Sequence, residues 1–151
     1  MSPNSKAGRT GFTLIEMMVV LAIIGTLALV VGPSVLKHVG DANSTTAKSQ
    51  IEIFAVALDA YRLDVGRYPT TEEGLAALRL PPGTGEPLPG WRGPYLRKAI
   101  PLDPWHRVYV YRSPGTRNPD SYDLYTLGRD GRPGGEGEDA DVTSWGEAVK
   151  P

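Results

Sequence analysis

Hydrophobic residues are concentrated near the N-terminus, where positions 12–36 form an almost unbroken apolar run. As a helix, Phe12–Leu36 would reach about 37 Å at 1.5 Å per residue, enough to cross a hydrocarbon core of about 30 Å. The polar segment before this run carries Lys6 and Arg9 and no acid. Because positive residues favour the cytoplasmic side, the pattern predicts a membrane helix whose C-terminal end leads across the membrane.

A second apolar pattern lies within residues 41–65 and has helical spacing. Its positions predict one buried face of a helix, made by Ala47, Ile51, Phe54, Ala55, Leu58 and Tyr61. Gly66 is a natural end for this helix. Gly32-Pro33 predicts a kink or local melting, and the polar stretch 41–46 could weaken the helix further. A single helix of about 80 Å exceeds what so small a domain can bury, so lipid or other copies must cover its first half.

The remainder of the chain, residues 66–151, is predicted to be a small loop-rich domain, because most of the 18 glycines and 14 prolines lie there. Thr70 and Glu73 predict a capping box at the start of a short helix with the sequence GLAALRL. Val108–Tyr111 and Tyr122–Tyr125 are predicted to form two antiparallel strands joined by a turn-rich segment. The expected fold class is therefore α+β, with a long helix, a short helix and a small antiparallel sheet.

Charge and composition limit the possible functions. The formal net charge of −1 gives no reason to expect a nucleic-acid partner, and the absence of cysteine rules out a disulfide. The only histidines are His38 and His106, and neither has a motif-level partner for catalysis. A membrane-anchored periplasmic enzyme is therefore the weakest alternative for this chain.

Glu16 is an anomaly, because it places a carboxylate inside the apolar run. An acidic residue at a helix centre costs roughly 2.5–3.5 kcal/mol to insert, and less near the end, so it indicates a function. A secretory signal peptide would end in a small-residue cleavage site after its apolar stretch. Here the small residue, Gly11, precedes the run, so cleavage there would leave the helix on the mature protein. A plain membrane anchor with a stray glutamate is the alternative.

The segment 127–141, LGRDGRPGGEGEDAD, is rich in acids and glycines. Carboxylate and carbonyl oxygens are the ligands that Ca²⁺ prefers, and glycines would let the segment fold back on itself. The spacing does not match an EF-hand. From the residues alone, a solvated acidic loop remains the alternative to a metal site.

The segment from Gly11 to Glu16, with the sequence GFTLIE, resembles the processing motif of prepilins. The resemblance implies that a membrane peptidase cuts after Gly11 and methylates the new N-terminal Phe12. Glu16 would then neutralise a terminal amine, usually that of a neighbouring subunit. Four residues separate it from Phe12, which puts both on one helix face. An ion pair at about 4 Å gains roughly 4 kcal/mol at an effective dielectric near 20, enough to offset insertion.

Later segments resemble the major pseudopilins of type II secretion systems, a subgroup with the type IV pilin-like fold. The matching segments are Tyr61–Asp64, Gly66–Glu72, Gly74-Leu75, Gly93–Leu96, Asp103–Trp105 and Gly134–Asp141. His106-Arg107 departs from the family, which usually has glycine after the tryptophan, often followed by asparagine. Adhesive type IV pilins commonly close their C-terminal loop with a disulfide, which this chain cannot form.

The resemblance also implies one calcium ion in the acidic loop. Carried over by position, its ligands are the side chains of Asp130, Asp139 and Asp141 and the Leu127 carbonyl, with Glu138 in reserve. The metal would stabilise a small domain that has no disulfide, because binding free energy appears as folding free energy.

The implied function is that of a structural subunit of the periplasmic pseudopilus, which drives folded proteins across the outer membrane. The chain would comprise a prepilin leader (1–11), a transmembrane and polymerisation helix (12–36) and a periplasmic domain (37–151), with the helix reaching about 65 and a globular part from 66. The expected location is the inner membrane, crossed once, and then the filament. Expected partners are other copies, minor pseudopilins, the prepilin peptidase, the inner-membrane secretion platform and, before assembly, lipid. A type IV pilin for adhesion or motility is the alternative.

Overall fold

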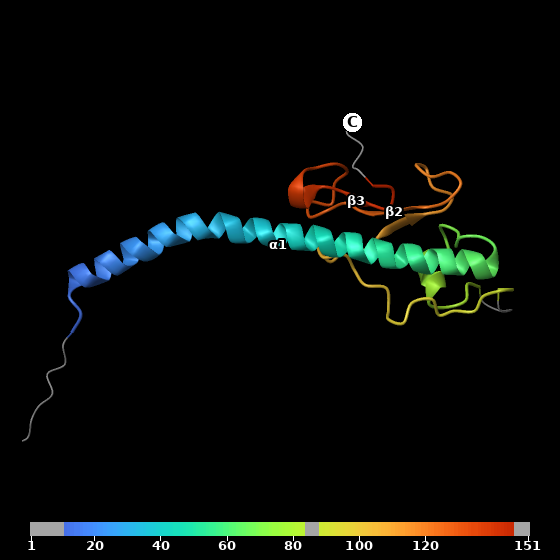
Figure 1. Ribbon diagram of the computed structural model, residues 1–151, viewed down its shortest axis with the longest axis horizontal. Coiled ribbons are helices and arrows are strands. Elements are labelled where there is room, and N and C mark those ends of the chain that lie inside the picture. Colours follow the sequence, from blue (N-terminus) through green and yellow to red (C-terminus); the bar gives the residue numbers. More distant parts are fainter. Residues whose placement is uncertain (1–10, 84–87, 147–151) are drawn as a thin grey trace, which may run out of the picture. The chain divides into compact units, whose positions relative to one another are not determined.

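The structure is a computed structural model that describes residues 11–83 and 88–146, with the side chains of 32–37 left aside. The chain divides into two units at His38 and Val39, and each unit is described separately (Figure 1). The elements in chain order are α1 (Leu14–Val65), η1 (Leu75–Leu78), β1 (Val110–Arg112), β2 (Asp123–Thr126), η2 (Gly137–Asp139) and β3 (Val142–Thr143).

The first unit holds the apolar part of α1. Leu14–Val31 has a mean hydropathy of 2.7, and none of these residues is buried. By length and composition this segment could cross a membrane. The exposed fractions of its large side chains run from 45% at Met17 to 79% at Leu29. This surface is what lipid or other chains would have to cover.

Helix α1 continues where the sequence predicts weakness. The helix runs without a break through Gly32-Pro33, so the expected local melting is not found there. The kink remains a prediction. The polar stretch 41–46 is helical too. Thr45 and Thr46 donate their hydroxyl groups to the carbonyls of Asp41 and Ala42, at 2.8 and 2.9 Å. Each hydroxyl thus donates a hydrogen bond to the backbone carbonyl four residues earlier in the same helix.

The second unit contains the hydrophobic core, and α1 contributes one face to it. The predicted positions Ala47, Ile51, Phe54, Leu58 and Tyr61 are each 0–2% exposed, which confirms the helical pattern. Ala55 was expected on this face but is only half-buried, and Ala57 is buried instead. Helix α1 ends at Val65, and Gly66 follows with φ 85°.

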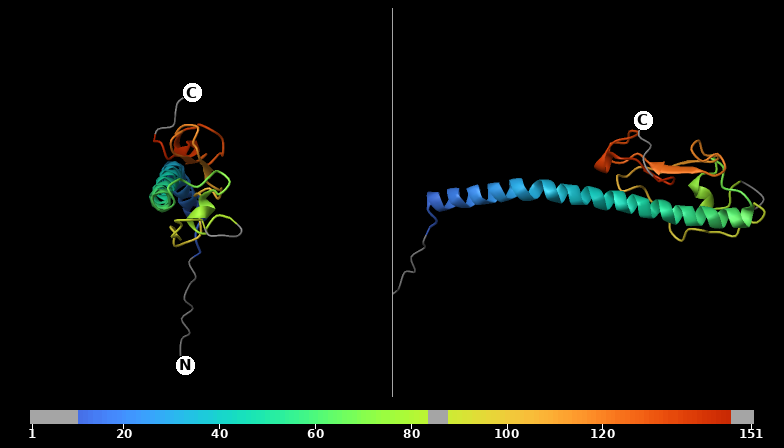
Figure 2. Two further views of the ribbon diagram at one scale, coloured as in Figure 1. Left: turned by 90° about the vertical axis from the view of Figure 1, so that its right-hand side faces the viewer. Right: turned by 45° about the horizontal axis from the view of Figure 1, so that its top comes forward.

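The sheet consists of three short antiparallel strands in the order β1-β2-β3. Tyr111 pairs with Leu124, and Thr126 pairs with Val142. Both predicted strands exist, shifted by one or two residues toward the C-terminus. Strand β3 was not predicted, because two residues are too few to show an alternating pattern. Figure 2 shows the strands lying along the C-terminal part of α1, whose buried residues share one core with Leu124 and Val142.

The predicted capping box is confirmed. The amide of Thr70 donates to Glu73 Oε2 at 2.8 Å, and the amide of Glu73 donates to Thr70 Oγ1 at 3.2 Å. The helix after it is shorter than expected, since residues 71–74 form a turn and only Leu75–Leu78 form a 3₁₀ helix. Gly74 has φ 57°, a left-handed conformation that interrupts a continuous α-helix.

Candidate assembly and metal sites

The start of α1 holds Glu16 in a local network. Thr13 donates to Glu16 Oε2 twice, from its amide at 2.7 Å and from its hydroxyl at 2.8 Å. The Glu16 amide donates back to Thr13 Oγ1 at 3.3 Å. Thr13 and Glu16 thus form a second capping box, which lowers the cost of placing the carboxylate in an apolar segment. This box was not predicted, although the sequence contains the Thr-x-x-Glu pattern on which such a prediction rests.

The network leaves part of Glu16 unused. Both bonds from Thr13 reach Oε2, and within residues 11–83 and 88–146 no hydrogen bond or ion pair to Oε1 is found. Glu16 is exposed, as is Phe12, with 79% of its surface accessible. The carboxylate can therefore accept a further donor from outside this chain.

The acidic loop, residues 127–141, folds back on itself through backbone hydrogen bonds. The Arg129 amide donates to the Glu138 carbonyl at 2.8 Å, and the Asp141 amide donates to the Gly134 carbonyl at 3.1 Å. Gly128, with φ 61°, lies so close to the opposite arm that an added Cβ would fall 2.7 Å from the Ala140 carbonyl oxygen. The glycines thus allow the two arms to meet, as the sequence predicts.

The predicted metal ligands occupy different surroundings within this loop. Asp141 and Leu127 line one cavity of about 300 Å³, and Asp141 Oδ1 is buried with no hydrogen-bond partner among the described residues. Asp130 is exposed, and its Oδ1 accepts the Arg132 amide at 2.9 Å. Across the described residues, no three Asp, Glu, His or Cys side chains gather closely enough to hold a metal ion. The predicted ligands therefore lie in one loop, but their side chains do not meet around a single position.

Glu138 and Asp139 are paired with an arginine of the same loop. Arg129 contacts Asp139 through Nε at 2.9 Å and through Nη2 at 3.1 Å, and it contacts Glu138 through Nη1 at 2.9 Å. These contacts raise the pKa of Arg129, chiefly through the hydrogen bond to Asp139. Arg129 was not predicted to take part in the site, although the sequence places this basic residue in the loop, two positions after Leu127.

A turn from the preceding segment supports the loop. Asp103 is 2% exposed and accepts the amides of Trp105 and Arg107, at 3.0 and 2.7 Å, and the hydroxyl of Thr126. His106 lies in this turn with φ 65°, a left-handed conformation that glycine adopts more readily. The departure from the family at His106 therefore leaves a glycine-type turn in place.

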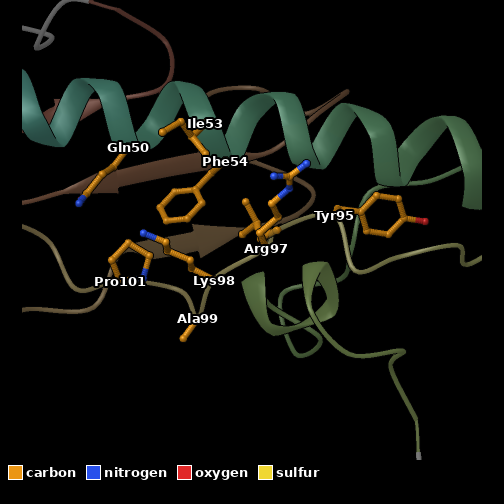
Figure 3. A pocket seen from close by; sticks show the side chains of 9 residues that line it. Gln50, Ile53, Phe54, Tyr95, Arg97, Lys98, Ala99 and Pro101 are labelled. Atoms are coloured by element: carbon orange, nitrogen blue, oxygen red, sulfur yellow. The ribbon is translucent and has the colours of Figure 1, made fainter.

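A separate apolar cavity of about 490 Å³ lies between α1 and the segment 95–101. Figure 3 shows Phe54 pointing from α1 toward the segment that carries Lys98 and Pro101. Arg97 and Lys98 are exposed at its margin. Its lining includes no residue of the acidic loop, so this cavity and the loop are separate features.

Two protein-family descriptions match this chain, one over most of its length and one near its N-terminus. Residues 34–145 match the family described as type II secretion system (T2SS), protein G, and residues 6–32 match the prokaryotic N-terminal methylation motif. The type II secretion system core protein G of Pseudomonas aeruginosa is 47% identical over 138 residues, which cover 91% of this chain and 95% of the relative. The protein of the same name from Vibrio cholerae is 44% identical, over 91% of this chain and 92% of the relative.

A solved structure shows the same similarity in three dimensions. The major pseudopilin from the type 2 secretion system of enterohaemorrhagic Escherichia coli aligns with a TM-score of 0.57 and 35% identity. The alignment covers 70% of this chain and 88% of that structure. The proteins that match along the chain point to a structural pseudopilin subunit of the secretion system and not to an enzyme. The chain belongs to the type II secretion system protein G family, and it serves as a subunit of the pseudopilus.

Proposed function

We propose that this subunit is cut between Gly11 and Phe12, methylated at Phe12 and held once across the inner membrane, with its globular part in the periplasm. Copies then leave the lipid and pack through their apolar helices into the filament. The observation that carries this is the helical segment Leu14–Val31, whose mean hydropathy is 2.7 and none of whose residues is buried. Minor pseudopilins, the prepilin peptidase and the inner-membrane platform are the proposed partners.

Processing is tested by intact-mass analysis of the membrane form from cells with active peptidase. The expected chain begins at N-methyl-Phe12. Gly11→Leu should block cutting, because a bulky side chain replaces the smallest residue at the cut, whereas Gly11→Ala serves as the tolerated control. A mature chain that still carries Lys6 would contradict the proposed cleavage.

Glu16 is proposed to serve assembly by accepting the terminal amine of a neighbouring subunit. Its free Oε1 supports this role, because the Thr13 network occupies only Oε2. Glu16→Ala should still insert in the membrane, because the cost of the charge is gone, and should fail to form filaments.

Glu16→Gln separates the charge from the capping role, since an amide oxygen can still accept the Thr13 amide. We expect this variant to resemble Glu16→Ala in a filament assay by electron microscopy and in secretion. Normal filaments from Glu16→Gln would show that capping alone is enough and that the charge is not required.

We also propose that the acidic loop binds one calcium ion through Asp130, Asp139, Asp141 and the Leu127 carbonyl, with Glu138 as an alternative ligand. The buried, unpartnered Asp141 Oδ1 beside Leu127 supports a cation there. Calcium would neutralise Asp130 and Asp141, which form no ion pair within the described residues. Asp130 is exposed and so free to turn inward, whereas both oxygens of Asp139 already accept Arg129.

The calcium proposal is tested by melting the full chain in detergent. Its fluorescence reports the globular part, because all three tryptophans, Trp91, Trp105 and Trp145, lie there. At one hundred times Kd, calcium adds about 2.7 kcal/mol, which moves Tm by roughly 10–20 °C for a domain near 100 residues. Magnesium should help far less, since it requires tighter octahedral geometry.

Matched variants assign the calcium effect to the loop. Asp141→Ala should abolish the calcium-dependent rise in Tm, and Asp120→Ala, which removes an exposed acid elsewhere, should leave it unchanged. An identical Tm in calcium and in chelator, together with no binding heat by calorimetry, would mean that the loop is acidic without being a metal site.

A further inference from the structure

The described loop already contains a cation of its own, the guanidinium of Arg129. This planar group uses Nε and Nη2 on the two oxygens of Asp139 and Nη1 on Glu138. A bidentate contact of this kind is stronger and more specific than a single charged hydrogen bond. Both carboxylates are thereby neutralised inside the chain, and both belong to the proposed calcium ligands.

The backbone beneath Arg129 is held in place by a second arginine. Arg107 donates from Nη2 to the Arg129 carbonyl at 2.6 Å and from Nη1 to the Gly128 carbonyl. The Arg107 amide is itself anchored on buried Asp103 at 2.7 Å. The Arg107 guanidinium also lies against Gly131, where an added Cβ would fall 2.8 Å from its Cζ.

The opposite arm is fixed as well, so the contact has little freedom to shift. The Arg129 amide donates to the Glu138 carbonyl at 2.8 Å. Glu138 packs on α1 at Gly40, where an added Cβ would fall 2.1 Å from Glu138 Cγ. Arg129 thus links two segments of the loop. Arg107 ties the segment around Arg129 to Asp103, and the segment around Glu138 contacts α1.

We propose that Arg129 is an internal cation that keeps the acidic loop closed without metal and competes with calcium for Asp139 and Glu138. This inference rests on the proposed calcium site. Each oxygen of Asp139 already accepts one hydrogen bond from the guanidinium, so a metal ion that binds the same oxygens has to displace or weaken these contacts. Arg129 therefore weakens calcium binding, and it lowers the dependence of loop order on calcium.

The test compares Arg129→Gln with Arg132→Gln in the full chain in detergent. Both variants remove one positive charge from the same loop, but Arg132 forms no ion pair within the described residues. In chelator, Arg129→Gln should melt several degrees below the parent chain, and Arg132→Gln should not. Calcium affinity is measured by calorimetry and by tryptophan fluorescence, to which Trp145 contributes from the cavity that it lines with Leu127 and Asp141.

We expect Arg129→Gln to bind calcium roughly three- to tenfold more tightly than Arg132→Gln, because only the first variant removes the cation that pairs with the ligands. The difference should shrink at high salt, because Arg129 is 58% exposed and its contacts are screened. Equal affinities for the two variants would overturn the competition while leaving the calcium site intact. Absence of calcium binding in all three chains would overturn the site and the competition together.

Discussion

Two capping boxes with the same pattern lie in different parts of this chain and have different surroundings. Thr13 and Glu16 begin the apolar helix, whereas Thr70 and Glu73 precede η1 in the globular part. The reciprocal bonds are nearly equal in length, with the threonine amide at 2.7 Å from Glu16 and at 2.8 Å from Glu73. Local sequence thus produces the same geometry twice.

The two capping boxes differ in whether a positive side chain of the same chain pairs with the glutamate. Arg67 binds both oxygens of Glu73, with Nη1 2.6 Å from Oε2 and Nη2 2.7 Å from Oε1. Glu16 forms no ion pair within the described residues. The globular part therefore satisfies its own carboxylate, and the apolar helix leaves one for a partner.

Helix α1 shows the same division. Between Ala47 and Tyr61 its core-facing side chains are covered by the chain's own domain, whereas Leu14–Val31 is covered by nothing in its unit. The second half is stabilised by tertiary packing, and the first half by whatever solvent or partner surrounds it. Substitutions in the two halves should therefore affect different measurements.

The largest expected effect comes from the core side of α1. Leu58 is 0% exposed, so Leu58→Ala should lower the free energy of unfolding by about 2–5 kcal/mol. Leu21, which is 68% exposed, provides the matched control, and Leu21→Ala should leave that free energy unchanged. Both are measured by denaturant titration of the full chain in detergent, followed by tryptophan fluorescence. Equal losses would mean that the two halves are not independently stabilised.

The two capping boxes provide the next test. Glu73→Ala removes a cap and a bidentate ion pair, and should cost about 1–3 kcal/mol of globular stability by the same titration. Glu16→Ala removes the corresponding residue from the apolar helix and should leave that stability unchanged. A loss of similar size from Glu16→Ala would show that the N-terminal box also supports the globular domain.

Acid should sharpen the contrast between the two glutamates. The hydrogen bonds from Arg67 lower the pKa of Glu73 below its usual value. Burial opposes this shift, and the hydrogen bond from the Thr70 amide adds to it. A lowered folded-state pKa adds stability that is complete above the unfolded value and is lost as pH falls through the folded one. The parent chain should thus lose stability below about pH 4.5 more steeply than Glu73→Gln does. Parallel pH profiles for the two chains would contradict this role of Glu73.

The smallest expected effect concerns the turn that supports the acidic loop. His106 has φ 65°, and a non-glycine residue there costs roughly 1–2 kcal/mol, partly offset by the entropy that glycine would lose. His106→Gly should therefore raise the free energy of unfolding by about 1 kcal/mol or less. Melting in chelator measures this, with His106→Ala as the control that keeps the strain. A clear loss on His106→Gly would mean that the imidazole makes a stabilising contact.

Features that depend on neighbouring residues could be predicted from the sequence. The apolar run, the helical spacing from Ala47 to Tyr61 and the capping box at Thr70 were all found where the pattern predicts them. Such features depend on backbone sterics and on hydrogen bonds within one or two helical turns, which a short stretch of sequence specifies. The capping box at Thr13 belongs to this class too.

The pairing of charges in the acidic loop, by contrast, depends on tertiary contacts. Arg129 pairs with Asp139 ten positions later, and Arg107 reaches Gly128 twenty-one positions later. Glycines permit many closures of such a loop, and the free energy of closing it changes slowly with length, so spacing alone does not select one pairing. The core that holds Asp103 and the close approach of Glu138 to Gly40 select it instead.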